Sequence, residues 1–276
     1  MAEIDLRKVT YEMIPNGTWR YDGVFWQALN YGVVGFDGEN FYFPESLSLR
    51  EMKDARERIS FILGLDTDLD EFYSQIAGSK FAFLSEEFHG LTVPASPYKY
   101  QALVEAVAQQ QVSFEFAKRT IAELVKLGGR KVGDLYLFPK PSDIGELTLE
   151  ELKKAKLGYR AEYIKHLTGL IIRGDLKLDL EGIDEEEGIR YLTKFRGIGK
   201  WTAELFLTYG LRKNVYPAGD LGLRRGIAKI FNLRPKEVRE RDVREILEPY
   251  GKWKGLLAFY VTCYDRKTEI EGKKDG

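Results

Sequence analysis

Cysteine and histidine are almost absent from this chain of 276 residues, which has one cysteine, Cys263, and two distant histidines, His89 and His166. A single cysteine excludes an intrachain disulfide and any zinc or iron–sulfur centre held by cysteines. Two distant histidines argue against catalysis by a histidine-bound metal. No run of about 18 apolar residues occurs, and the first residues are acidic. We therefore expect no membrane segment, no signal peptide and a cytoplasmic location.

The chain also lacks a large excess of positive or of negative charge. The 42 Lys and Arg nearly balance the 43 Asp and Glu, and the net charge is -1. The whole-chain charge therefore gives no support for nucleic-acid binding, and a DNA partner would require a local concentration of positive charge. Hydrophobic residues make up 44% of the chain, which is ample for a buried core. Charged residues are plentiful while Asn and Gln are scarce, a composition compatible with a thermophile.

The N-terminal quarter predicts β-structure over residues 18–43. Two Asp-Gly pairs, Asp22-Gly23 and Asp37-Gly38, lie between aromatic and β-branched runs, and such pairs are strong hairpin signals. We expect residues 1–80 to form a small α+β domain with an antiparallel sheet. Residues 81–276 are expected to form a helical body of two lobes.

Helical signals begin at Ser96-Pro97, a typical N-cap followed by proline. Apolar residues then recur at helical spacing as far as Leu124, and Gly128-Gly129 ends the helix. Further signals predict later helices, and the last six residues predict a frayed tail. These signals are the capping-box spacing of Thr148 and Glu151, an amphipathic run from 160 to 172 that ends at Gly174, an N-cap at Asp184, and helices at 219–231, at 235–249 and after Trp253.

A Gly-Ile-Gly turn at residues 197–199 separates two helical segments, so residues 190–210 predict a helix-hairpin-helix. The two glycines allow a positive φ and close approach of a phosphate. The free N–H groups at the start of the next helix would face that phosphate. An ordinary helix–helix turn is the alternative, but residues 190–230 hold nine basic and two acidic residues. This local positive excess favours phosphate binding.

Phe195–Ala203, followed by residues 216–220 (Tyr-Pro-Ala-Gly-Asp), resembles the helix-hairpin-helix plus Gly/Pro-Asp signature of base-excision DNA glycosylases. The subfamily that it most resembles is that of the 3-methyladenine DNA glycosylases II, the AlkA-like enzymes of alkylation repair. Residues 108–113 resemble the wedge loop of that subfamily, and residues 157–164 resemble a helix that it shares with the 8-oxoguanine glycosylases. The resemblance covers residues 96–265 and implies a cytoplasmic, nucleoid-associated repair enzyme of a prokaryote.

The resemblance implies that Asp220 is the catalytic carboxylate, which stabilises positive charge on the sugar and activates water. An N-cap aspartate is the alternative for the same position, and both can hold. The resemblance also places Trp201 in the base pocket, where an indole suits a cationic methylated purine. Trp253, Phe114 and Tyr216 are further pocket candidates, and core packing is the alternative for each.

The hairpin residues Gly197, Ile198, Gly199 and Lys200 are expected to bind the DNA backbone without reading its sequence. The nucleophilic lysine of the bifunctional glycosylase/lyases lies one residue after Lys200, where this chain has Trp201. Lys200 is therefore interpreted as a phosphate contact, and the enzyme as monofunctional. No cofactor is required. The resemblance does allow a structural monovalent or divalent cation at the backbone carbonyls of three hairpin residues, Thr193, Phe195 and Ile198.

Gln111 and Val112 match the wedge that fills the gap left by a flipped base, although the subfamily usually has an apolar residue where Gln111 stands. A polar break inside a helix is the alternative. The chain is thus expected to act as a monomer on double-stranded DNA with a damaged, alkylated purine. Two other functions stay open, an 8-oxoguanine DNA glycosylase/lyase and a non-enzymatic helix-hairpin-helix DNA-binding protein.

Overall fold

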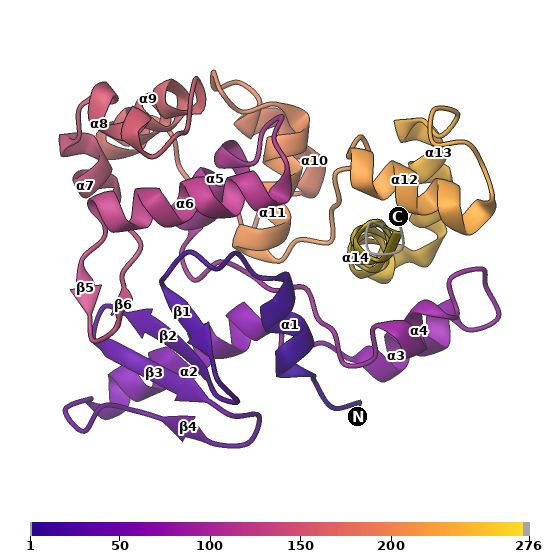
Figure 1. The fold of residues 1–276 in the computed structure, drawn as a ribbon, viewed down its shortest axis with the longest axis horizontal. Helices are drawn as coiled ribbons and strands as arrows, with labels where there is room; N and C mark the ends of the chain where they lie inside the picture. Colours follow the sequence, from indigo (N-terminus) through magenta and orange to yellow (C-terminus); the bar gives the residue numbers. More distant parts are fainter. Residues whose placement is uncertain (1, 273–276) are drawn as a thin grey trace.

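The computed structural model describes residues 2–272 (Figure 1). It confirms the α+β class, with a small antiparallel sheet near the N-terminus and helices over most of the remaining chain. Within the described range, no helix is long and apolar enough to cross a membrane. The tail predicted for residues 271–276 lies outside the described residues except for its first two positions, where α14 (Lys254–Gly272) ends.

The sheet has the strand order β1-β2-β3-β4, and every neighbouring pair is antiparallel. Asp22-Gly23 turns the chain between β1 and β2, and Asp37-Gly38 turns it between β3 and β4, as predicted. Helix α2 packs its apolar side against this sheet in one shared core. The strands are β1 (Trp19–Tyr21), β2 (Phe25–Leu29), β3 (Gly32–Phe36) and β4 (Phe41–Tyr42), with a separate two-stranded sheet of β5 (Lys131–Val132) and β6 (Leu135–Tyr136).

Two hydrophobic cores underlie the two lobes. The first core joins the sheet and α1–α4 with the C-terminal elements α12, α13 and α14, and the second fills the lobe of α5–α11. The chain therefore leaves the first lobe after α4 and returns to it at α12, so residues on both sides of the predicted boundary at residue 80 share one core. The helices of the first lobe are α1 (Leu6–Glu12), α2 (Leu49–Leu63), α3 (Leu69–Ile76), α4 (Leu84–Glu87), α12 (Leu221–Phe231), α13 (Glu240–Leu247), the 3-10 helix η1 (Glu248–Trp253) and α14.

The second lobe confirms several predicted helix ends. Thr148 forms the capping box of α8, Asp184 caps α10, and Gly174 adopts a left-handed conformation at the end of α9. Its helices are α5 (Lys99–Ala108), α6 (Phe114–Gly128), α7 (Pro141–Glu146), α8 (Leu149–Lys154), α9 (Arg160–Arg173), α10 (Glu185–Leu192) and α11 (Lys200–Leu211).

Three helix predictions were wrong in their bounds. Helix α5 begins at Lys99 with Tyr98 as its N-cap, because the Ser96 hydroxyl donates instead to the buried carboxylate of Glu105. The continuous helix predicted up to Leu124 is interrupted at residues 109–113, where Gln111 takes a φ of 52° that no α-helix contains. The helix predicted at 235–249 is shorter, because α13 spans Glu240–Leu247 and a 3-10 turn follows it.

Candidate active site

A cleft of about 1510 Å³ opens between the two lobes. Its walls come from α5, the loop at 109–113, the hairpin at 193–199, α11, the start of α12 and α14. Most of the residues predicted for the site therefore meet at one place, although they are spread over more than 100 positions of the sequence. The predicted residues that line the cleft are Gln111, Val112, Phe114, Thr193, Phe195, Gly197, Ile198, Gly199, Trp201, Tyr216 and Asp220.

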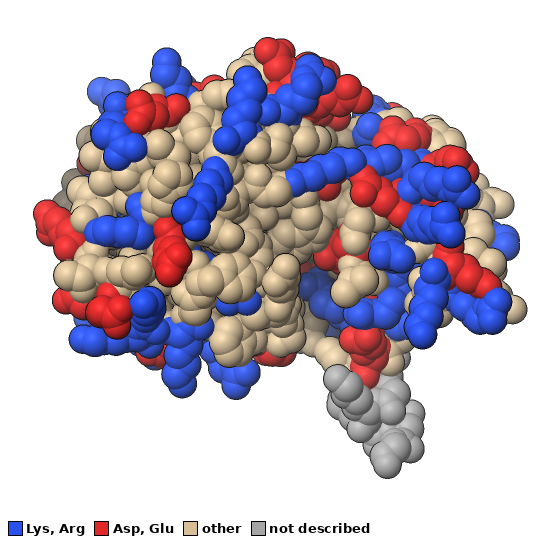
Figure 2. All heavy atoms as spheres, turned by 90° about the horizontal axis from the view of Figure 1, so that it is seen from above, with Lys and Arg blue, Asp and Glu red and all other residues tan. Residues whose placement is uncertain are grey.

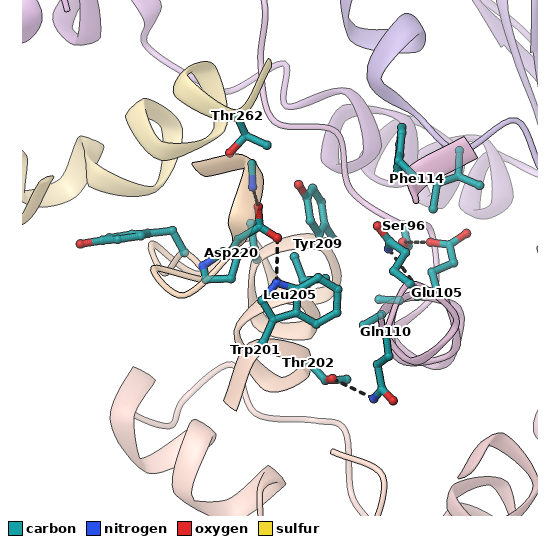
Figure 3. Close-up of a pocket in the computed structure, with 18 of the residues that line it drawn as sticks. Ser96, Glu105, Gln110, Phe114, Trp201, Thr202, Leu205, Tyr209, Asp220 and Thr262 are labelled. Carbon is teal, nitrogen blue, oxygen red and sulfur yellow. Dashed lines mark hydrogen bonds between the residues drawn. The ribbon is translucent and has the colours of Figure 1, made fainter. Parts of the chain in front are cut away.

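Asp220 lies at the start of α12, and three N–H donors hold its carboxylate (Figure 3). One oxygen, Oδ1, accepts the backbone N–H groups of Gly222 at 2.8 Å and Leu223 at 3.1 Å. The other oxygen, Oδ2, accepts the indole N–H of Trp201 at 3.0 Å. Asp220 is therefore the N-cap of α12, and its carboxylate is held in a fixed position at the wall of the cleft. Such a group can stabilise positive charge that develops beside it.

Two predicted residues are not brought to the cleft. Lys200 is half-exposed, and its amine forms an ion pair with Glu240 of α13. The Trp253 ring packs on Phe72 of α3, with the ring centres 5.7 Å apart, at the edge of the first core. Tyr216 is buried and lines the cleft, and its hydroxyl donates to Glu248 at 2.9 Å.

The two glycines of the hairpin differ in backbone conformation. Gly197 has a φ of 98°, and a Cβ there would lie 2.8 Å from the Tyr163 ring, so this position requires glycine. Gly199 has a φ of -87° and serves as the N-cap of α11, so only Gly197 uses the positive φ that a glycine allows. No atom lies within 4 Å of a Cβ at Gly199. That open space at a helix N-terminus is what a phosphate would need.

Gly199→Leu is expected to weaken binding to all duplexes by about tenfold, because its side chain would occupy the space proposed for phosphate while the fold keeps its packing. The matched variant Gly197→Ala is expected to lower stability by about 1–3 kcal/mol, because of its backbone conformation and the Tyr163 ring. Fluorescence anisotropy on duplexes of several sequences, with thermal unfolding of each variant, measures both effects. A loss for Gly199→Leu that is confined to one DNA sequence would contradict the phosphate role.

The loop between α5 and α6 is tied to the hairpin by Gln110. Its amide nitrogen donates to the carbonyl of Gly197 at 2.8 Å and to the Thr202 hydroxyl at 3.0 Å. Arg160, at the start of α9, donates from Nε to the carbonyl of Gln110 at 2.7 Å. The next residue of the loop, Gln111, is exposed and left-handed. The loop is therefore held at its base, and the exposed Gln111 accepts a hydrogen bond from the Tyr159 hydroxyl at 3.4 Å.

The basic residues of 190–230 do not form one patch. Arg212 points into the first lobe and donates to the carbonyls of Phe61 and Val93, at 3.1 and 2.9 Å. Lys213 likewise donates to two carbonyls of the segment before α10. Figure 2 accordingly shows Lys and Arg interspersed with Asp and Glu on the face seen from above. The charge count therefore overstates the positive charge of the surface. At the hairpin, the exposed Lys194 and Arg196 provide this positive charge.

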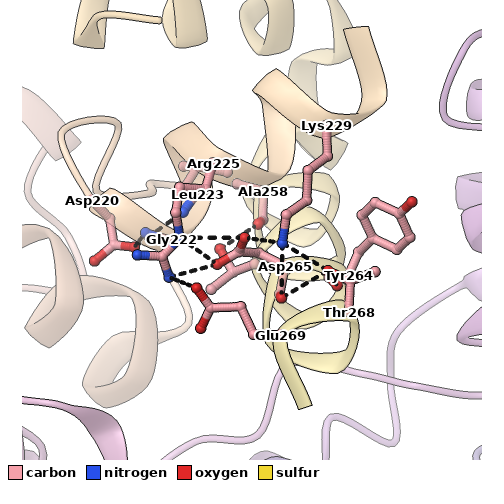
Figure 4. Close-up of polar contacts among 11 residues, drawn as sticks. Asp220, Gly222, Leu223, Arg225, Lys229, Ala258, Tyr264, Asp265, Thr268 and Glu269 are labelled. Carbon is pink, nitrogen blue, oxygen red and sulfur yellow. Dashed lines mark hydrogen bonds and ion pairs between the residues drawn. The ribbon is translucent and has the colours of Figure 1, made fainter. Parts of the chain in front are cut away.

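The helix that presents Asp220 is fastened to α14 by a buried carboxylate (Figure 4). Asp265 has no exposed surface and accepts Arg225 Nη2 at 2.7 Å and Lys229 Nζ at 2.7 Å. Gly226 allows the two helices to approach, since a Cβ there would lie 2.5 Å from the carbonyl oxygen of Val261. The position of Asp220 therefore depends on the packing of α12 against α14.

Several cleft residues escaped the sequence analysis. Tyr209 directs its hydroxyl into the cleft (Figure 3), and burial raises the pKa of that hydroxyl. Arg266 of α14 lies over the Phe114 ring at 4.8 Å. A polar stripe of Gln101, Glu105 and Gln109 runs along α5 toward the cleft. The four-residue spacing of these polar residues could have predicted the stripe, because residues at this spacing share one helix face. The apolar residues between them gave the stronger periodic pattern, so the stripe was missed.

Known proteins resemble this chain in sequence and in fold. The sequence profile described as "HhH-GPD superfamily base excision DNA repair protein" matches residues 104–250. The DNA-3-methyladenine glycosylase of Bacillus subtilis is 30% identical over 205 residues, which cover 71% of this chain and 67% of that protein. The solved structure of a 3-methyladenine DNA glycosylase from Archaeoglobus fulgidus matches with a TM-score of 0.80 and 30% identity, over 96% of both chains. An 8-oxoguanine glycosylase/lyase from Clostridium acetobutylicum shares the fold, with a TM-score of 0.79 at 18% identity over 98% of this chain and 94% of that one.

Proposed function

This chain belongs to the HhH-GPD superfamily of base excision DNA repair proteins, and from that premise we propose that it is a monofunctional DNA glycosylase that releases alkylated purines from duplex DNA. The observation that carries the proposal is the Asp220 carboxylate, held by three N–H donors at the wall of the cleft. The relatives named for 3-methyladenine support the alkylated class of base.

The proposed reaction breaks the bond between C1′ of the sugar and the nitrogen of the base. Positive charge builds on the sugar as the electron pair leaves with the base, and the anionic Asp220 stabilises that charge. A water molecule then attaches its oxygen to C1′ and gives up a proton, which Asp220 is placed to accept. An N-alkylated purine that is already cationic leaves as a neutral molecule, so the reaction needs no separate acid to protonate it.

The other cleft residues take roles around the flipped base. Trp201, Phe114 and Tyr216 offer aromatic walls to a cationic purine, while Gln111 and Val112 project toward the gap in the duplex. Gly197, Ile198, Gly199 and Lys200 bind the backbone, and Lys200 exchanges Glu240 for a phosphate. Trp253 is left out of the pocket because it packs against α3.

A structural cation at the hairpin is part of the same proposal. Thr193, Phe195 and Ile198 would supply their carbonyl oxygens, and the cation would join the hairpin to a phosphate. The carbonyl of Phe195 accepts the N–H of Ile198 at 3.1 Å, and its second lone pair fits such a cation. Among residues 2–272 there is no group of three or more His, Cys, Asp or Glu that could hold a metal ion, so carbonyls are the ligands that the proposal needs.

A panel of lesions tests the proposal. Duplexes treated with dimethyl sulfate, and oligonucleotides with one hypoxanthine or one 8-oxoguanine, would be incubated with the protein, and released bases would be measured by mass spectrometry. We expect release of methylpurines, with strands that break only after alkali or heat. Release of 8-oxoguanine with direct strand scission would favour the glycosylase/lyase, and binding without any release would favour a DNA-binding protein.

A further inference from the structure

The middle residue of the polar stripe of α5, Glu105, is a buried carboxylate that the reaction described above does not use. Glu105 is 7% exposed and lines the cleft, on a helix whose residues 100–108 are all buried. Figure 3 shows Glu105 with Ser96 on the far side of the pocket from Asp220, with Tyr209 between them. Burial of a carboxylate is unfavourable because it loses hydration, unless hydrogen bonds replace the lost water. The partners of Glu105 therefore decide what it does.

Three donors from separate segments surround Glu105. Asn16 and Gln101 donate to its Oε1, both at 2.9 Å, and Ser96 donates to its Oε2 at 2.6 Å. Burial raises the pKa of Glu105, and these three hydrogen bonds act in the opposite direction. A carboxylate has about four acceptor positions, so Oε2 keeps one that no donor among the described residues fills.

A second acceptor beside Glu105 also has no donor. The Gln101 side chain is 3% exposed and lines the cleft, and its Oε1 is buried without a hydrogen-bond partner among the residues that the structure describes. Buried acceptors of this kind are rare, because a buried oxygen without a donor loses the hydrogen bonds that it makes with water in the unfolded chain. The wall opposite Asp220 therefore holds two neighbouring side chains of one helix with unfilled acceptor capacity, one of them a carboxylate.

We propose that Glu105 and Gln101 form a recognition site for the amino-bearing edge of the flipped purine. The inference rests on the proposed function and adds a specificity-determining pair to it. An exocyclic amino group supplies N–H donors to both acceptors, and the negative charge of Glu105 suits a base whose ring is cationic. A base that lacks the amino group leaves a buried acceptor unpaired, and sites built to bond an N–H discriminate strongly against such analogues.

The test compares two cationic bases that differ only in the amino group. Poly(dG-dC) methylated with dimethyl sulfate carries 7-methylguanine, and poly(dI-dC) treated in the same way carries 7-methylhypoxanthine. The variant Glu105→Gln is expected to lower kcat/KM for 7-methylguanine by about ten- to hundredfold, and for 7-methylhypoxanthine by less than about threefold.

Two further variants separate recognition from folding. Gln101→Leu removes the second acceptor and is expected to change the ratio of the two substrates in the same direction. Ser96→Ala removes a donor to Glu105 but no acceptor, so it is expected to lower the thermal midpoint while leaving that ratio unchanged.

The inference would be overturned if Glu105→Gln lowered kcat/KM equally for both substrates. It would also be overturned if Ser96→Ala changed the ratio of the two kcat/KM values as much as Glu105→Gln does. Either result would show that Glu105 has a structural role. Release of none of these bases by the wild-type protein would instead overturn the proposed function.

Discussion

Asp220→Asn is expected to leave a protein that folds and binds DNA but releases almost no base. The carboxylate supplies the negative charge next to the sugar, and loss of one electrostatic contribution of this kind costs roughly 3–4 kcal/mol, or about 10²- to 10³-fold in rate. Single-turnover release of methylpurines, measured with saturating enzyme, isolates the chemical step from binding. Near-normal release by the variant would refute the proposed mechanism.

The geometry of Asp220 makes asparagine an informative replacement. An asparagine oxygen can still accept the N–H groups of Gly222 and Leu223, and asparagine is as good an N-cap as aspartate. The cap of α12 is therefore kept while the charge is removed. Asp184→Asn is the matched control, because Asp184 caps α10 through two backbone N–H groups at 2.9 and 3.3 Å and is exposed. Both variants are expected to keep the thermal midpoint, and only Asp220→Asn is expected to lose activity.

Local signals in the sequence predicted the local features of the fold. The Asp-Gly turns, the caps at Thr148 and Asp184 and the glycine end of α9 depend on a few neighbouring residues, and these predictions were confirmed. The start of α5 was predicted wrongly for a non-local reason. The Ser96 hydroxyl bonds to Glu105, nine residues away, instead of capping the helix that follows it.

The sequence predicted the site residues that belong to a known motif. It missed the residues that only the three-dimensional packing brings to the cleft. Asp220 and the hairpin belong to such a motif, and the structure brings them to one cleft. Tyr209 follows a run of buried residues in α11, and Arg266 follows the largely buried first part of α14, so no periodicity distinguishes them. The charge count at 190–230 was misleading in the opposite way, because Arg212 satisfies backbone carbonyls of the first lobe instead of facing DNA.

Borohydride is expected to trap no covalent adduct between the wild-type protein and a lesion-bearing duplex. In a lyase reaction a lysine amine bonds to C1′, the base departs with the electron pair, and the resulting imine is reduced by borohydride. The cleft wall at Asp220 holds Trp201 instead of a lysine. Lys200 lies about 100° away around α11, and its amine pairs with Glu240.

The variant Trp201→Lys tests the same mechanism through the appearance of an adduct that the wild-type protein is expected not to form. The indole nitrogen of Trp201 lies 3.0 Å from Asp220 Oδ2, and a lysine side chain can reach the same place, so its amine would stand beside the carboxylate that activates it. The variant is expected to give a trapped adduct and direct strand scission, where the wild type leaves an abasic site that breaks only in alkali. Trp201→Phe, which removes the indole N–H without adding an amine, is the control and is expected to give no adduct. A wild-type adduct that disappears in Lys200→Ala would mean that Lys200 turns into the cleft when DNA binds, and the protein would then be a bifunctional enzyme of the oxidised-purine type.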